Sequence, residues 1–136
     1  DYKVRIGKHM LTGHIDLVEV YKNEKGGEDI VLTNFLVDEK RMPNVNIRRE
    51  WSTTAASYAF RQLINVSEQK IVYHGIVSGK RHETERDESD FEQLEHLVDN
   101  IVKTIEQDIY YPRLNERCYS CPFQKTCEKG WFDVKD

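Results

Sequence analysis

The chain has 136 residues and a formal net charge of -4; 38% of the residues are hydrophobic, 32% are charged, and three are prolines. This composition predicts a single globular domain over 1–136, and the acidic balance excludes a protein that coats nucleic acid nonspecifically through many Lys or Arg contacts to phosphate. No run approaches the roughly 18 apolar residues of a membrane span, and the N-terminus lacks the apolar core of a signal peptide, so we expect a cytoplasmic protein without a membrane partner.

The first third of the chain predicts strands. The segments "YKVRIG" at 2–7, "MLTGHIDLVEVY" at 10–21 and "DIVLTNFLV" at 29–37 are rich in β-forming residues. The polar, glycine-bearing "KNEKGGE" separates the last two, so we expect a hairpin with a moderately long turn.

A helix is predicted over 44–65, with Asn46 as its cap. Ile47, Trp51, Ala55 and Leu63 fall near the spacing of one helical face, so we expect Trp51 in the core. The alternating "KIVYHGIVSG" predicts a further strand that ends at Gly79.

The strongest helical pattern follows an acidic stretch, and its start is marked by Asp87 and Ser89. Its apolar stripe comprises Phe91, Leu94, Leu97, Val98, Ile101, Val102 and Ile105. Periodicity then ends, and a cysteine-bearing tail covers 112–136. The order of elements predicts an α/β or α+β fold with a mixed central sheet, a β-hairpin core and flanking helices.

The predicted hairpin could carry metal-dependent hydrolysis. Such a site needs one carboxylate on the first strand, then a carboxylate and a lysine two residues apart on the second, because residues i and i+2 share a strand face. Asp16 stands in an apolar stretch, where an unpaired charge would be costly. Asp38 and Lys40 form a literal D-x-K. His14 could be a further metal ligand or a base, but a hydrogen-bonded structural role is more common for a lone histidine.

Three cysteines lie within ten residues, in "CYSCPFQKTC" at 118–127. Cys118, Cys121 and Cys127 are spaced to reach one metal centre. Zinc would require a fourth Cys or His, and a [4Fe-4S] cluster a fourth Cys. Neither ligand set is complete in this motif.

These motifs, in this order, resemble the RecB-type branch of the PD-(D/E)XK nuclease superfamily, which includes the nuclease domain of AddB and CRISPR-associated adaptation exonucleases. The matching pieces are "GHID", "LTNFLVDEKRMP", "TAASYAF", "IVYHGIVSGK" and the cysteine motif. The resemblance implies a Mg²⁺- or Mn²⁺-dependent DNA exonuclease of repair, recombination or phage or CRISPR-type processing. Asp16 and Asp38 would hold the metal, and Lys40 would assist hydrolysis.

The family motif also aligns in a second way. Aligned by its apolar neighbours, it places Asn34 where the second carboxylate belongs, Leu36 where the lysine belongs, and Thr54 where a helix glutamine is expected. Pairing Asp16 with Asn34 centres the hairpin turn near Lys25, whereas pairing it with Asp38 centres the turn on Gly27; both turns are plausible. In the first register the chain would be a catalytically silent homologue that acts as a DNA-binding or assembly module.

The resemblance also implies a cofactor and partners. In the family, three C-terminal cysteines join one upstream cysteine to hold a [4Fe-4S] cluster. The present chain lacks that fourth ligand, so we expect an N-terminally truncated domain in which the cluster is absent. Lys40, Arg41, Arg48 and Arg49 are candidate DNA contacts, and a helicase or recombination protein is a candidate partner. A more distant alternative is an unrelated interaction domain that shares only the cysteine motif.

Overall fold

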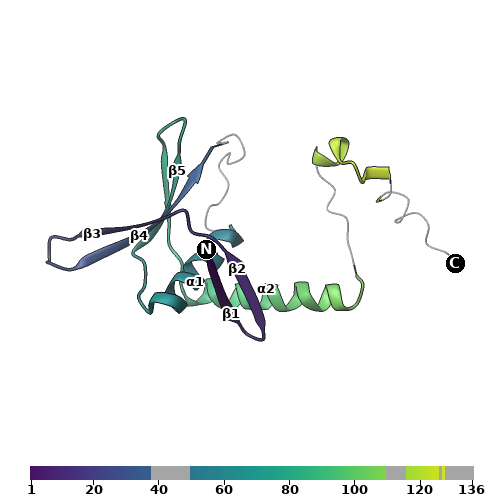
Figure 1. The fold of residues 1–136 in the computed structure, drawn as a ribbon, viewed down its shortest axis with the longest axis horizontal. Coiled ribbons are helices and arrows are strands. Elements are labelled where there is room, and N and C mark those ends of the chain that lie inside the picture. The colour runs from purple at the N-terminus through teal and green to yellow at the C-terminus, as the bar shows by residue number, and fades with distance from the viewer. Residues whose placement is uncertain (38–49, 110–115, 126, 128–136) are drawn as a thin grey trace. The chain divides into compact units, whose positions relative to one another are not determined.

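The structure is a computed structural model that describes residues 1–37, 50–109, 116–125 and 127. Its contacts divide the chain into two compact units, residues 1–101 and 102–136. Figure 1 traces the elements in chain order: β1 (Tyr2–Ile6), β2 (His9–Gly13), β3 (Leu17–Lys22), β4 (Glu28–Leu36), α1 (Trp51–Ile64), β5 (Lys70–Gly75), β6 (Arg81–Thr84), α2 (Glu88–Glu106) and the short 3-10 helix η3 (Glu116–Ser120).

A mixed four-stranded sheet, in the order β3-β4-β5-β6, lies at the centre of the first unit. The pairs β3–β4 and β5–β6 are antiparallel, and β4–β5 is parallel. Helix α1 makes the crossover between the two parallel strands. The predicted α/β class, with a mixed sheet, a hairpin and helices, is confirmed (Figure 1).

One side of this sheet, here called the α1 side, packs against helix α1. Leu32 of β4 and Ile71 of β5 contact Phe60 of α1, and all three are at most 5% exposed. Because side chains alternate along a strand, Thr33 and Val72 point to the opposite side, here called the far side.

The hairpin β1–β2 forms a second layer on α1. Tyr2, Val4 and Ile6 are buried and alternate with exposed residues, which is the pattern of a strand with one side in a core. Tyr2 and Val4 pack with Ala56 and Ala59 of α1, whose short side chains allow a close approach.

Helix α2 closes this layer through Leu94, which packs with Ile6 and Ala55. Its start, at the position that the sequence predicted, is a reciprocal cap: the backbone N–H of Asp90 donates to Asp87 Oδ1 at 3.1 Å, and the N–H of Asp87 donates to Asp90 Oδ2 at 3.0 Å. Among the described helices, none has the length and apolar content needed to span a membrane.

The single strand predicted over 10–21 is wrong. β2 ends at Gly13, β3 begins at Leu17, and Asp16 lies in a bend between them. The break is required because β2 pairs with β1 whereas β3 pairs with β4, in a different sheet.

The strand predicted to end at Gly79 is also shorter. β5 ends at Gly75, where a turn closed by the bond from Gly75 N–H to the Lys80 carbonyl (2.9 Å) leads into β6. Gly79 has φ +69°, which favours glycine. The sequence did not predict β6 because "RHET" is polar and largely exposed.

Helix α1 starts later than predicted. Glu50 is its N-cap instead of Asn46, and Trp51 is 42% exposed, so its predicted core position is wrong. Thr53 and Thr54, at 1% and 2% exposure, occupy the buried face of the first turn.

Candidate functional site

The Asp16 side chain accepts a backbone hydrogen bond from β4 at a point where β3 no longer pairs with that strand. Its Oδ2 accepts the backbone N–H of Phe35 at 2.8 Å. Thr33, opposite Leu17, is the last β4 residue that pairs with β3, so the Phe35 N–H lies beyond the end of the ladder. Oδ1 lies 3.4 Å from Nε2 of His14, whose side chain is 73% exposed. The charge in this apolar stretch therefore satisfies a backbone donor.

The turn of the hairpin is organised by Asn23. Its Oδ1 accepts the backbone N–H groups of Lys25 at 3.1 Å and Gly27 at 2.8 Å. Gly26, with φ +78°, supplies the left-handed residue that the turn needs. These local bonds centre the turn at Lys25.

The register of β3–β4 follows from this turn. Leu17 pairs with Thr33, and Lys22 pairs with Glu28. One step beyond the ladder, Asp16 comes level with Asn34. The described ladder thus has the register that places Asp16 level with Asn34. Asp38, the partner in the alternative pairing, lies outside the described residues.

This register gives the site a weak set of ligands. Asn34 offers a neutral amide, and Leu36 offers no charge and no hydrogen bond. On the other side of β4, Asn34 pairs with Tyr73 of β5. Among the described residues, Asp16 is thus level with a neutral amide on β4 and lies beside His14.

A buried polar layer lies where the sheet meets the first turn of α1. The Tyr73 hydroxyl bonds the hydroxyl of Thr53. Burial, and then the nearby carboxylate of Glu50, raise the pKa of Tyr73 to about 12, so the phenol stays protonated. Thr54 accepts a bond from Arg86 Nε at 2.8 Å, so its hydroxyl is bound within the fold. Sequence reasoning singled out neither Tyr73 nor Arg86: Tyr73 lies within the strand motif at 71–80 but was given no role, and Arg86 lies in no recognised motif.

A buried ion pair fixes α1 next to this layer. Arg61 Nε and Nη2 each lie 3.0 Å from a Glu68 oxygen, and the Glu68 side chain is 1% exposed. Ser57 donates to the same carboxylate at 2.5 Å. The hydrogen bonds to Glu68 are the main cause of a raised pKa at Arg61.

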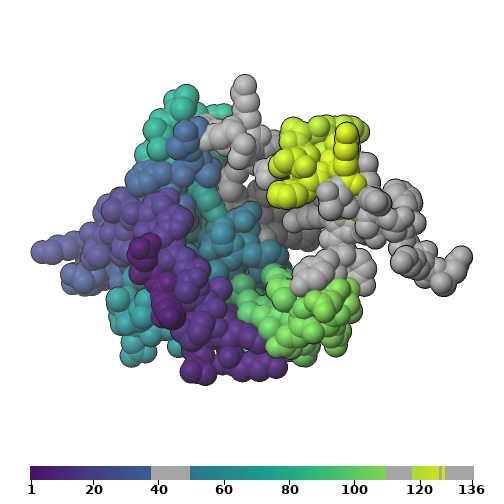
Figure 2. Space-filling view, turned by 45° about the vertical axis from the view of Figure 1, so that its right-hand side comes forward, coloured from purple at the N-terminus to yellow at the C-terminus, as the bar shows by residue number. Residues whose placement is uncertain are grey.

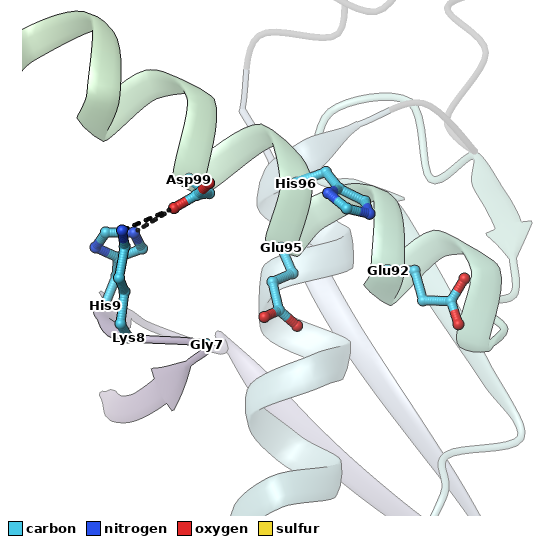
Figure 3. Close-up of a pocket in the computed structure, with 7 residues that line it drawn as sticks. All are labelled: Gly7, Lys8, His9, Glu92, Glu95, His96 and Asp99. Carbon is cyan, nitrogen blue, oxygen red and sulfur yellow. Dashed lines mark hydrogen bonds and ion pairs between the residues drawn. The ribbon is translucent and has the colours of Figure 1, made fainter.

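A second polar region lies between the β1–β2 turn and α2 (Figure 3). His9 Nε2 and Lys8 Nζ approach Asp99 Oδ1 at 3.3 and 3.4 Å. Gly7, with φ +53°, lies so close to Glu95 that an added Cβ would meet its carboxylate oxygen at 2.6 Å. The hollow has a volume of about 590 Å³ and is lined by Gly7, Lys8, His9, Glu92, Glu95, His96 and Asp99. These contacts tie the turn to the helix.

Several predicted site residues lie outside the described residues: Asp38, Lys40, Arg41, Arg48 and Arg49. Of the three cysteines, Cys118 is half-buried, and Cys121 and Cys127 are exposed; none of the three forms a disulfide. Within the described ranges, no three His, Cys, Asp or Glu side chains are arranged to hold a metal ion. Cys118, Cys121 and Cys127 give at most three of the four thiolates of a [4Fe-4S] cluster.

Comparison with known proteins gives one family. The sequence model described as "PD-(D/E)XK nuclease superfamily" matches residues 1–128, nearly the whole chain. A search of curated proteins gives no match.

Proposed function

Since the chain belongs to the PD-(D/E)XK nuclease superfamily, we propose that it binds nucleic acid as a module whose central site has lost the residues for hydrolysis. Membership makes phosphodiester hydrolysis the ancestral activity and nucleic acid the expected ligand. Asn34 and Leu36 stand where the family pattern has a carboxylate and a lysine.

The hydrogen bond from Phe35 N–H to Asp16 carries this proposal. It holds the carboxylate at the backbone of Phe35, whose neighbours along β4 are Asn34, with a neutral amide, and Leu36, with an alkyl chain. Neither residue can add charge to a metal site or offset the charge of a phosphate. A strand of DNA held there would meet little that activates water.

Binding itself would use the cations between β4 and α1. Lys40, Arg41, Arg48 and Arg49 fall in the sequence between Leu36, the last residue of β4, and Trp51, the first residue of α1. Contacts of this kind to phosphate position a strand without reading its sequence. A helicase or recombination protein remains the candidate partner of such a module, and the cytoplasm its expected location.

A metal-dependent DNA exonuclease of RecB type is the second candidate. It is favoured by the family match, which includes the literal D-x-K of Asp38 and Lys40. Asp16 and Asp38 would then hold Mg²⁺ or Mn²⁺, and Lys40 would orient water. This arrangement requires residues 37–40 to return toward Asp16 past the end of β4.

The cysteine tail has a separate test. The family resemblance assigns Cys118, Cys121 and Cys127 to a [4Fe-4S] cluster with a fourth thiolate from elsewhere. Protein purified anaerobically, with the full natural chain, should be brown and absorb near 400 nm. A colourless protein that contains zinc would contradict the cluster.

DNA binding is tested by fluorescence anisotropy with a labelled oligonucleotide at several salt concentrations. We expect Arg48→Ala with Arg49→Ala to weaken binding and to reduce the salt slope by about 0.9 for each lost phosphate contact. Lys25→Ala, at the turn of the β3–β4 hairpin, is the control and should leave both unchanged. Absence of binding by the wild-type chain at low salt would refute the proposal.

A further inference from the structure

Strand β3 is an edge strand of the described four-stranded sheet. In the described part of the chain it pairs only with β4. It has six residues, "LVEVYK", without proline or glycine. Natural edges are usually blunted by charges, proline or bulges, because free strand groups pair with other strands. The one cation of β3, Lys22, lies at its end.

The side chains of β3 are unusually apolar for an edge in water. Val18 and Val20, on the α1 side, are 43% and 55% exposed. Leu17 and Tyr21, on the far side, are 40% and 45% exposed. Leu63 and Ile64, near the end of α1, are also exposed. In Figure 2 the β3–β4 hairpin projects from the first unit.

The backbone groups that point outward can be assigned. The Phe35 N–H points toward the β3 side, where Asp16 accepts it, and the Leu36 carbonyl points toward β5, where it accepts from Ile76. Because the direction of the backbone groups alternates along a strand, the odd-numbered β4 residues bond β3. Their partners on β3, Leu17, Glu19 and Tyr21, bond β4 in return. Val18, Val20 and Lys22 therefore turn their N–H and C=O groups to the free edge.

We propose that β3 pairs antiparallel with β3 of a second copy of this chain, with Val20 opposite Val20 of the copy. A two-fold axis perpendicular to the sheet places the α1 sides of both copies on the same face of the joined sheet. Two residues that lie opposite each other are therefore both even-numbered or both odd-numbered. Val18 then lies opposite Lys22 of the copy, and the three outward-facing residues form bonded pairs along the whole strand.

Charge selects this register. A shift of the centre to Glu19 would put two carboxylates directly opposite each other, which is unfavourable. With Val20 at the centre, each Glu19 lies beside Tyr21 of the copy. The Tyr21 hydroxyl already donates to Glu19 within its own strand at 2.5 Å, so the same donor suits the copy's carboxylate.

The apolar contact adds to the backbone bonds. On the α1 side, Val20 would cover Val20 of the copy, and the alkyl stem of Lys22 would cover the copy's Val18. One strand pair buries much less than a standard interface, so the dimer should be weak and depend on protein concentration.

Analytical ultracentrifugation of the full chain between about 1 and 300 µM tests the proposal. We expect the mean mass to rise from one chain toward two, and Val20→Lys to weaken dimerisation at least tenfold, since Lys is a natural edge blocker. Val77→Lys is the matched control: Val77 is 82% exposed and lies in the β5–β6 turn. A wild-type chain that stays monomeric, or a dimer that Val20→Lys leaves intact, would overturn the proposal.

Cysteine cross-linking tests the register. Under mild oxidation, Val20→Cys should give a disulfide between two copies of residue 20, identified by mass spectrometry. Val18→Cys should give no 18–18 link, because the two positions would be about 13 Å apart at strand rise. Equal 18–18 and 20–20 links would contradict the register. These readings need no DNA, so they fail or succeed independently of the proposed function.

Discussion

At the scale of single residues, Asp16 has a structural task that a catalytic assignment alone would overlook. Its carboxylate satisfies the Phe35 N–H at 2.8 Å where the ladder between β3 and β4 ends. We predict that Asp16→Ala lowers the free energy of unfolding by about 1 to 2 kcal/mol, because a charge-assisted bond is lost. Asp16→Asn, which keeps an acceptor oxygen, should cost less. Urea denaturation measures both.

His14→Ala is the control for Asp16, because the His14 side chain is 73% exposed. Its effect should stay within about 0.5 kcal/mol. If Asp16→Ala is as stable as wild type, the carboxylate does not support β4.

Glu68 should be far more important for stability than its neighbour Glu88. Glu68 is 1% exposed and accepts two bonds from Arg61, whereas the Glu88 side chain is 85% exposed at 3.7 Å from the same guanidinium. We expect Glu68→Gln to lower the free energy of unfolding by about 3 kcal/mol, since it leaves a partly buried cation unpaired. Glu88→Gln should change it by less than about 0.5 kcal/mol. Equal effects in thermal or urea unfolding would refute the difference.

Glu19 gives a prediction in pH. Hydrogen bonds from Thr33, and then from Tyr21, lower the pKa of Glu19 from its usual 4.5. Its contribution to stability is therefore present above pH 4.5 and is lost as the pH falls through the lowered pKa. Thr33→Val should raise the Glu19 pKa, as measured by NMR titration, and its stability deficit should shrink in acid. An unchanged Glu19 pKa would contradict the bond.

At the scale of elements, the β3–β4 register decides what surrounds Asp16. Asn34→Asp would restore a second carboxylate beside Asp16, and without metal the two charges should repel and lower the melting temperature. Mn²⁺ at about 1 mM should then raise the melting temperature of Asn34→Asp by several degrees, but not that of wild type, since a ligand stabilises only the state that binds it.

Asn100→Asp, on α2, is the matched control and should gain nothing from Mn²⁺. Equal Mn²⁺ responses of Asn34→Asp and wild type in the thermal shift measurement would argue against the proximity of residues 16 and 34.

The elements that the sequence predicted well are those with local signals. β4 and the start of α2 follow from alternation and from the cap at Asp87. The break around Asp16 and the strand β6 depend on which distant strand each segment joins, and no local pattern records that. The choice between Asn34 and Asp38 was open for the same reason: it depended on the side-chain bonds of Asn23 that centre the turn.

At the scale of the whole molecule, the fold is that of the family, and the proposed function rests on a departure from the family pattern at Asn34 and Leu36. The superfamily match spans residues 1–128, and the mixed sheet with its crossover helix is present. The buried positions near the site are filled by neutral or internally bonded groups such as Tyr73 and Thr54. Such a molecule would keep the shape that receives nucleic acid after its hydrolytic residues have changed.

The most direct measurement is cleavage of linear DNA by the purified chain with Mn²⁺, on samples in which binding is confirmed by anisotropy. We predict that bound DNA stays intact at every Mn²⁺ concentration, because the carboxylate of Asp16 is held at the Phe35 backbone, between Asn34 and Leu36. Mn²⁺-dependent degradation that disappears in both Asp16→Ala and Lys40→Ala would contradict this prediction and establish the exonuclease.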